Sequence, residues 1–350
     1  MTSSHKIPHP LEALLQVDIH NKGPLRFDRY MELALYHPEF GYYRQKRHRV
    51  GKSEGTDFYT ASTLANGFTS LLAGALKERL GSDISRYTLI EWGTEGGGLP
   101  WEDHDLNVRE ILRIPLGEDP MFPSPAIHFS NELFDAQPFR RFVFAKGRWM
   151  ELFVDWNPQT EEFVEAPRTP DPLSINSFPS PLPESQAEGY CIDLPTGANT
   201  LLRKIVEPSW EGLFVAFDYG RTWENLLTET PQGTLRGYHR HAQVHGLYKS
   251  PGEIDLTGHI CWDSMEYILK EYGFQEIQCE RQESFFVKNA PKTLKQVLTS
   301  CHNPLDPLRR EVAALLHPSH FGQAFQVLTA VRKTMPKNSP NHSSTFTSDT

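Results

Sequence analysis

Cysteine is scarce in this sequence and forms no recognisable pattern. The 350 residues include four cysteines, and no two of them form a CxxC pair. Scattered cysteines are typical of ordinary buried thiols in a reducing compartment. We therefore expect a cytoplasmic protein without a disulfide framework.

Long apolar runs and an excess of positive charge are also missing. No apolar stretch approaches the roughly 20 residues that span a bilayer, and residues 1–16 lack the apolar core of a secretory signal. The formal net charge is −9, from 35 basic and 44 acidic side chains. Because nucleic-acid binding needs a basic face, we expect neither a membrane span nor a nucleic-acid partner.

Two groups of sequence motifs are absent as well. No HExxH or similar spacing occurs, so a metal site is not expected, although histidines and acids gather in one region: His239, His241, His245, Glu253, Asp255 and His259. The glycine-rich stretch GTEGGG lacks the G-x-G-x-x-G spacing of dinucleotide-binding proteins. This disfavours a NAD-dependent oxidoreductase.

The sequence does contain short apolar runs that each end in polar residues. Residues 87–92, 126–129 and 213–217 predict buried strands. Helical periodicity predicts helices between and around them, at 27–37, 64–80, 196–206, 262–272, 294–301 and 305–316. This alternation indicates an α/β fold, in which ligands bind outside the carboxyl ends of the strands. Glu91, Glu132 and Asp218 should then converge on one rim, if these strands are parallel neighbours.

The remaining segments define the expected domain organisation. Residues 26–334 are predicted to form one domain with a β-hairpin insertion near 139–192, after an N-terminal extension at 1–25. We expect residues 274–287 to form two closing strands. Residues 335–350 are polar and predict a disordered tail. The hairpins at 142–156 offer a surface for a homodimer.

Five blocks in a fixed order resemble the MidA-like family of SAM-dependent methyltransferases. They are FDRYMELALYHPEFGYY, GTDFYTAS with the helix after it, SNELFDAQPF, FDYG, and GTLRGYHRHAQ followed by PGEIDLTGH. They extend from about residue 27 to about residue 259, and the family includes the mitochondrial complex I assembly arginine methyltransferase. The resemblance implies a Rossmann-like class I methyltransferase sheet with an N-terminal helical lid. It also implies S-adenosyl-L-methionine as methyl donor and an arginine on a protein as a candidate acceptor.

The sequence departs from the family pattern at the donor side. In LIEWGTEGGGLP, the family motif E-x-G-P-G-x-G is matched at Glu91, Gly93 and Gly97, but Glu95 stands where a glycine is expected. Residues 99–129 leave room for one strand, near 108–116, where a full methyltransferase half has two strands and two helices. We therefore expect a sheet that is shortened between its first and fourth strands.

The candidate site combines the rim residues with the family blocks. Carboxylates suit a guanidinium because they accept paired hydrogen bonds, and we expect Glu132, Asp135 and Asp218 to be catalytic. The cofactor-binding candidates are Glu91, Gly93, Gly96, Gly97, Asn131 and Glu132. The family reading makes the lid and the loop at 236–259 substrate-binding, through Tyr30, His37, Tyr43, His239 and His259.

Structural readings of the same residues remain open. The glycines can simply form a turn, and Asn131 with Glu132 can cap a helix. An acid for the ribose of the donor is also left open between Glu110 and Glu118. The alternative function is a catalytically impaired methyltransferase-fold protein that acts as a binding or assembly factor.

Overall fold

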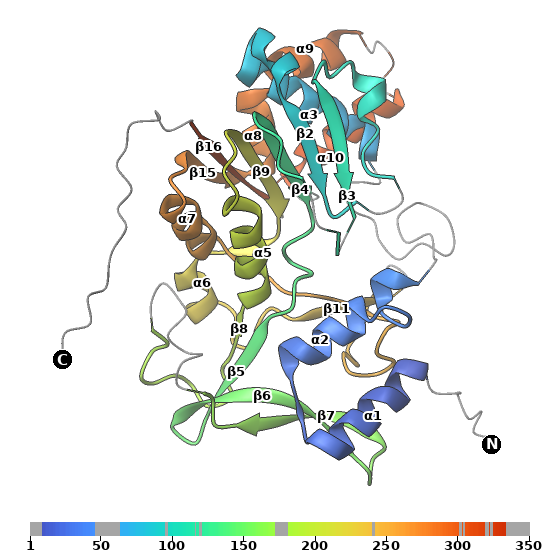
Figure 1. Cartoon of the computed structure of the whole chain (residues 1–350), viewed down its shortest axis with the longest axis vertical. Helices are drawn as coiled ribbons and strands as arrows, with labels where there is room; N and C mark the ends of the chain where they lie inside the picture. Colours follow the sequence, from blue (N-terminus) through green and yellow to red (C-terminus); the bar gives the residue numbers. More distant parts are fainter. Residues whose placement is uncertain are drawn as a thin grey trace.

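A six-stranded sheet lies in the upper half of the molecule as drawn in Figure 1. The computed structural model describes residues 9–45, 64–94, 97–115, 117–118, 121–171, 181–239, 242–300, 303, 305–318, 322 and 325–333. The strands follow the order β3 (Glu110–Ile114), β2 (Thr88–Trp92), β4 (Ala126–Asn131), β9 (Gly212–Asp218), β16 (Gln326–Arg332) and β15 (Gln275–Arg281). The first four are parallel, whereas β16 and β15 are antiparallel to their neighbours.

The predicted α/β fold is confirmed, including its shortening. β3 is the one strand beyond β2 in the described part of the chain, and the connection from β2 contains the short 3-10 helix η4 (Trp101–His104). The three strands expected at 87–92, 126–129 and 213–217 are β2, β4 and β9. They are parallel neighbours, as convergence of their carboxyl ends requires.

Helices cover both faces of this sheet, because its strands alternate their side chains between two apolar layers. Along β9, Leu213, Val215 and Phe217 pack toward α3 (Ala65–Leu80), α8 (Gln282–Asn289), α9 (Pro291–Ser300) and α10 (Pro307–Leu316). Phe214 and Ala216 pack toward α5 (Thr196–Val206) and α7 (Trp262–Glu271). Two-sided burial explains why β9 reads as a continuous apolar run.

Local signals fix the ends of several helices. α3 ends where Gly81 adopts φ +58° and donates its N–H to the Lys77 carbonyl. α10 begins with Asp306, whose side chain accepts the Arg309 N–H, followed by Pro307 in the first turn.

A second sheet lies beneath the first and belongs to the insertion (Figure 1). It contains β1 (Leu25–Arg26), β6 (Arg148–Asn157), β5 (Arg140–Ala145), β8 (Cys191–Leu194) and β7 (Glu162–Arg168). The N-terminal helices α1 (Pro10–Lys22) and α2 (Phe27–Tyr36) share an apolar cluster with it. The expected hairpin system is therefore present.

The remaining elements are short. They are η1 (Tyr42–Arg44), η3 (Gly81–Arg86), β10 (Gly220–Arg221), α6 (Trp223–Thr228), β11 (Arg236–His239), β12 (Ala242–Gln243), β13 (Asp255–Thr257) and β14 (Ile260–Cys261). β11 pairs with both β12 and β13 in a small three-stranded sheet.

The expectation of two closing strands at 274–287 is wrong in its second half. β15 ends at Arg281, and α8 follows at once, with Gln282, Phe285 and Phe286 buried at helical spacing. The partner of β15 is β16, a strand that the sequence reading did not identify. The predicted tail at 335–350, the block at 55–62, Glu95 and Gly96 lie outside the described residues.

Candidate functional site

The carboxyl ends of β2, β4 and β9 lie at one edge of the sheet. β4 pairs with β2 on one side and with β9 on the other. Ala126 of β4 is opposite Thr88 of β2 and opposite Gly212 of β9. In open α/β sheets, the crevice outside such strand ends is the usual ligand site. The predicted convergence of Glu91, Glu132 and Asp218 at this edge agrees with the strand order, since Glu132 directly follows β4.

A tight turn follows β4 and is held by Asp218. The backbone of Glu132 has φ +51°, which is uncommon for a residue other than glycine. The Asp218 carboxylate accepts the N–H of Phe134 at 2.8 Å and the N–H of Tyr219 at 2.9 Å. Asp218 is completely buried, and its contacts make it a positioning residue for the turn.

Four carboxylates gather around this turn, and we call them the carboxylate cluster: Glu132, Asp135, Asp218 and Asp255. Asp135 is 6% exposed and Asp255 is 3% exposed, while Glu132 is half-buried. Burial raises the pKa of Asp135 well above its ordinary value, and the other three carboxylates raise it further. Among the described residues, neither Asp135 nor Asp218 forms an ion pair with a lysine or arginine.

The pKa of Asp218 is raised to about 7. Burial is the largest cause, and the hydrogen bonds from the backbone of the turn oppose it. A carboxyl group with this pKa changes its protonation near neutrality, so the charge of the cluster depends on pH in that range.

Tyrosines from the N-terminal lid border the cluster. The Tyr43 hydroxyl donates to Asp255 Oδ1 at 2.8 Å, and the Tyr43 ring stacks on Tyr36 with centroids 5.4 Å apart. The Tyr36 hydroxyl donates to the Ala136 carbonyl at 2.8 Å. The lid thus hydrogen-bonds to Ala136, just after the turn, and to Asp255 of the cluster.

Glu91 is at the predicted rim, but its side chain is already bound within the protein. Oε1 accepts the Leu99 N–H at 2.9 Å, and Oε2 accepts the Trp101 indole N–H at 2.8 Å. The Arg113 guanidinium lies 3.7 Å from Oε2. Burial raises the pKa of Glu91, while these three groups lower it.

S-adenosylmethionine, the donor that the resemblance implies, fits one side of the crevice and not the other. On the β4 side, Asn131 Oδ1 is buried with no hydrogen-bond partner in the described residues. Gly97 has φ +106° and open space where a Cβ would stand, so a ligand can approach there. On the other side, β3 ends at Ile114 without a carboxylate, and Glu91 is already hydrogen-bonded. No free carboxylate is therefore available for a ribose at the described ends of β2 and β3.

Gly93 differs from Gly97 because its backbone is close to another side chain. Gly93 has φ +72°, and a Cβ there would meet the Leu133 side chain at 2.7 Å, so it allows the turn after β4 to approach β2.

Glu110, a candidate for the ribose contact, lies opposite Thr88 at the amino end of β3. It is therefore at the wrong edge of the sheet. Glu118 follows β3 and is exposed.

The structure brings one of the five expected substrate-binding residues, Tyr43, into the carboxylate cluster. Tyr30 is fully buried among apolar side chains, with its hydroxyl 3.4 Å from the Tyr248 carbonyl. His37 accepts two backbone N–H groups at the end of α2. His239 Nδ1 lies 3.0 Å from the Glu253 carbonyl. These three side chains make local structural contacts.

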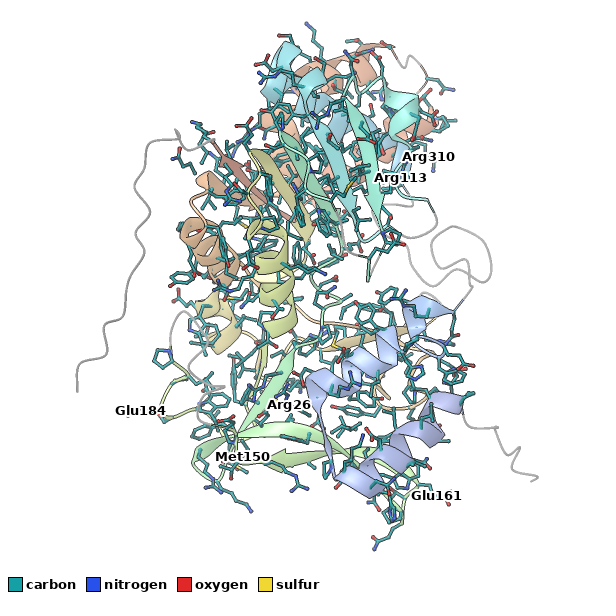
Figure 2. All side chains as sticks on the ribbon, viewed as in Figure 1. Arg26, Arg113, Met150, Glu161, Glu184 and Arg310 are labelled. Carbon is teal, nitrogen blue, oxygen red and sulfur yellow. The ribbon has the colours of Figure 1, made fainter. Side chains whose placement is uncertain are left out.

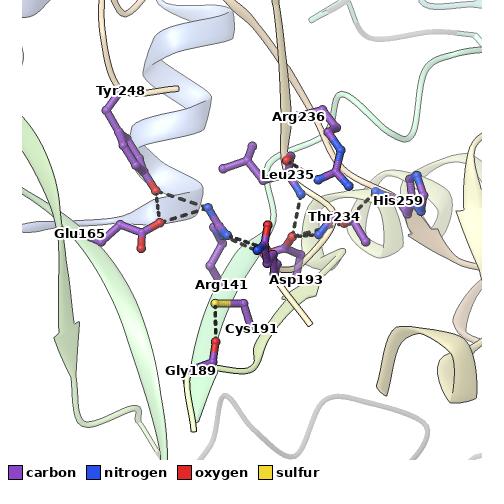
Figure 3. A network of polar contacts seen from close by, with 11 residues as sticks. Arg141, Glu165, Gly189, Cys191, Asp193, Thr234, Leu235, Arg236, Tyr248 and His259 are labelled. Carbon is purple, nitrogen blue, oxygen red and sulfur yellow. Dashed lines mark hydrogen bonds and ion pairs between the residues drawn. The ribbon is translucent and has the colours of Figure 1, made fainter. Parts of the chain in front are cut away.

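His259 lies in a polar network that connects the insertion to the loop before β11 (Figure 3). Its backbone N–H donates to Thr234 Oγ1 at 3.0 Å, and burial lowers its pKa to about 4. Asp193 of β8 accepts the Arg141 guanidinium at 2.9 Å and the N–H of Leu235 at 2.8 Å, and it also accepts the Thr234 N–H. A single buried carboxylate thus fixes β5, β8 and the start of β11 together.

Asp255 and Asp193 were not predicted as site residues. Asp255 had an available signal, because it stands within the block PGEIDLTGH. Asp193 had none, since its partners lie 41 to 52 residues away in the sequence. No group of three or more His, Cys, Asp or Glu side chains within the described ranges is arranged to hold a metal ion. In the same ranges no helix combines the length and apolarity needed to cross a membrane.

Comparison with known proteins identifies relatives of this chain. A family model of S-adenosyl-L-methionine-dependent methyltransferases matches residues 109–279. The mitochondrial protein arginine methyltransferase NDUFAF7 of Rattus norvegicus is 24% identical over 221 residues, which are 62% of this chain and 47% of that protein. The Mus musculus protein of the same name is 27% identical over 135 residues, covering 39% of this chain and 29% of that protein. The chain thus matches about half or less of the length of these curated relatives.

Two solved structures from Burkholderia thailandensis share the fold. One was crystallised with S-adenosyl-homocysteine and superposes with a TM-score of 0.77 at 22% identity, covering 94% of this chain and 95% of that chain. The other, in its native form, gives a TM-score of 0.73 at 21% identity with the same coverage. Residues 109–279 are thus similar to S-adenosyl-L-methionine-dependent methyltransferases, and the chain shares its fold with a structure that binds S-adenosyl-homocysteine.

Proposed function

We propose that the protein methylates the guanidinium of an arginine on a partner protein. The observation that supports this acceptor is the carboxylate cluster at the carboxyl edge of the sheet, where Asp135 and Asp255 are almost completely buried. Burial raises the pKa of Asp135, and the carboxylates of Asp218, Glu132 and Asp255 raise it further by repulsion. An entering cation relieves that repulsion, so the cluster is complementary to positive charge.

The geometry of a guanidinium matches this cluster better than that of an ammonium. Guanidinium is planar and presents five N–H donors, which pair with carboxylates two at a time. The tyrosines at the lid, Tyr36 and Tyr43, are also suited to neighbour it, because guanidinium stacks well on aromatic rings. The two curated relatives are named protein arginine methyltransferases, which agrees with this acceptor.

Each residue of the cluster has a separate role in the proposal. When bound, S-adenosylmethionine supplies a methyl group activated by a sulfonium. Glu132 and Asp135 bind and orient the guanidinium, while Asp218 positions both through the turn and Tyr43 positions Asp255. The acceptor nitrogen loses a proton on methylation, and a carboxylate with a raised pKa is suited to take it.

A peptide array tests the acceptor class. Peptides that contain arginine, and copies with lysine or citrulline in its place, are incubated with the full chain and radiolabelled S-adenosylmethionine. We expect label on the arginine peptides alone. Glu132→Gln should lower the rate at least about tenfold, because a half-buried, hydrogen-bonded charge is lost from the acceptor site.

Glu229→Gln is the matched control, since Glu229 is an exposed glutamate whose ion pair is with Arg221 and not with a residue of the cluster. It should retain the rate of the unmodified protein. Equal labelling of lysine peptides, or full activity of Glu132→Gln, would remove arginine or Glu132 from the proposal.

A second candidate function is supported by Glu91. Because both of its oxygens are hydrogen-bonded inside the protein, a family member that binds its acceptor without turnover is the alternative. In that case the arginine peptides bind the chain and remain unlabelled at every donor concentration.

A further inference from the structure

The segment that follows the glycine turn folds back over the end of β2. Residues 98–106, which we call the plug, include the buried side chains of Leu99, Trp101 and Leu106. Trp101 is 1% exposed and packs edge-on against Phe129 of β4, with ring centroids 5.5 Å apart. The plug therefore covers the sheet next to the crevice between β2 and β4.

Glu91 of β2 and Arg113 of the edge strand β3 both hydrogen-bond to the plug. Glu91 accepts one backbone N–H and one indole N–H from the plug. Arg113, on β3 (Figure 2), donates to the Leu99 carbonyl at 3.0 Å and to both carboxylate oxygens of Glu102, at 2.9 and 3.0 Å. At Gly98, a Cβ would stand 2.7 Å from Glu91 Oε2 and 2.9 Å from Arg113 Nε. The backbone thus packs directly on this ion pair.

These contacts use Glu91, which is the carboxylate nearest the carboxyl edge among the described residues of β2 and β3. β2 offers Glu91, and β3 ends in Ile114 and Pro115. A ribose is normally bound through its hydroxyls by an acid at such a strand end. The same Glu91 cannot accept ribose hydroxyls while it accepts Leu99 and Trp101.

The acceptor side is built from different contacts. Asp218 holds Phe134, Asp255 is held by Tyr43, and the Gly258 N–H donates to the Asp135 carbonyl at 2.9 Å. None of these bonds involves the plug, so the carboxylate cluster is complete while the plug is closed.

We propose that the plug is an autoinhibitory element: it closes the donor side through Glu91 and must release Glu91 before the donor binds in full. The acceptor arginine binds to the closed form. This inference rests on the proposed acceptor site and adds the order of binding. It predicts weak donor binding by the unmodified chain and an acceptor affinity that does not depend on the plug.

Titration calorimetry with S-adenosyl-homocysteine tests the plug in the full chain. Trp101→Phe keeps the ring and removes the indole N–H that Glu91 accepts. Since hydrogen bonds to a charged group are the stronger ones, we expect this variant to bind S-adenosyl-homocysteine about tenfold more tightly. Glu102→Gln, at an exposed position, weakens the Arg113 contact without a risk to folding and should tighten binding by a smaller factor.

Trp210→Phe is the matched control. Trp210 is 3% exposed, its indole donates to the Ile205 carbonyl at 2.9 Å, and it packs on the opposite face of the sheet. It should lose stability like Trp101→Phe while its affinity for S-adenosyl-homocysteine stays unchanged. An arginine peptide should bind all of these proteins with one affinity.

Two outcomes would contradict the proposal that the plug is autoinhibitory. One is an affinity for S-adenosyl-homocysteine that is the same in the unmodified chain, Trp101→Phe and Glu102→Gln, whether strong or undetectable. The other is a bound structure in which Trp101 still donates to Glu91. Failure of the proposed function looks different: the variants bind S-adenosyl-homocysteine more tightly, yet no arginine peptide binds or is labelled.

Discussion

At the scale of single residues, Asp218 has two properties that matter for the site: it holds the turn after β4, and its pKa is raised. Its carboxylate receives the backbone N–H groups of the turn after β4, and burial still raises its pKa to about 7. The raised pKa of Asp135 has the same main cause. The cluster therefore holds protons at a pH where ordinary aspartates have lost theirs.

This protonation predicts how acceptor binding depends on pH. A guanidinium keeps its charge throughout, so the bound state favours ionised carboxylates, and protons must leave when it binds below about pH 7. We expect the affinity for an arginine peptide to fall as the pH decreases from 8 to 6, by up to about tenfold per pH unit. Calorimetry in two buffers with different ionisation heats measures both the affinity and the released protons.

An affinity that stays constant from pH 6 to 8, with no proton release, would contradict the role of these carboxylates. A citrulline peptide serves as the control, because its neutral side chain should show no such dependence.

The rim residues were predictable because each stands at the end of an apolar run. Glu91, Asn131 and Asp218 lie where parallel strands end, and the period of the sequence reveals those ends. What each side chain contacts was not predictable. Glu91 is bound by Leu99 and Trp101, and only the folded path of the chain after Gly97 brings them together.

At the scale of elements, the insertion depends on a buried ion pair between β5 and β6. Arg140 donates to both oxygens of Glu151, at 2.7 and 2.5 Å, and both side chains are below 10% exposed. Arg140→Met leaves the Glu151 charge buried without its partner. We expect this to lower the free energy of unfolding by about 3–5 kcal/mol, measured by urea denaturation.

Arg203→Met is the comparison, because Arg203 and Glu271 form an exposed pair at 2.8 Å. Its effect should be below about 1 kcal/mol. Equal effects of the two substitutions would show that burial adds nothing to the Arg140 pair.

The helix that replaced an expected strand shows where sequence patterns reach their limit. QESFFV contains adjacent phenylalanines, and this short apolar pair fits either a strand or a helix. In the structure, Phe285 and Phe286 pack in one apolar cluster with α3, and Gln282 one turn earlier donates to the Leu315 carbonyl of α10. Contact with α3 decides in favour of the helix, and that contact is not visible in the local sequence.

At the scale of the whole molecule, Asp193 connects the insertion to the acceptor side of the site (Figure 3). It fixes the start of β11, and β11 pairs with β13 so that Tyr238 is opposite Asp255 of the carboxylate cluster. Disturbing Asp193 should therefore affect a distant carboxylate through one strand pair.

Asp193→Asn tests this connection. It removes one of the two carboxylates that pair with the buried Arg141 guanidinium, and Glu165 remains as the other. We therefore expect a loss of about 1–3 kcal/mol in the free energy of unfolding and a weaker affinity for an arginine peptide. Asp155→Asn is the control within the insertion, since the Asp155 side chain accepts the N–H of its neighbour Trp156. If the Asp193→Asn protein is destabilised but binds the peptide with unchanged affinity, the insertion does not influence the site through Asp193.

The domain boundaries remain a prediction. The shortened sheet was readable from the length of the chain between Gly98 and Ser130. The long-range pairing of β16 was not, because its neighbours β9 and β15 are far away along the chain. The cytoplasmic setting and the homodimer remain predictions.

The shortened sheet has a consequence for how molecules of this protein meet one another. β3 is left as an edge strand, and an edge with unpaired N–H and C=O groups can add strands from another molecule. Charged side chains at Glu110 and Arg113 occupy that edge, and Arg113 is held by Glu102. The residue that fastens the plug therefore also places charge on the exposed edge, which discourages aggregation of the truncated sheet.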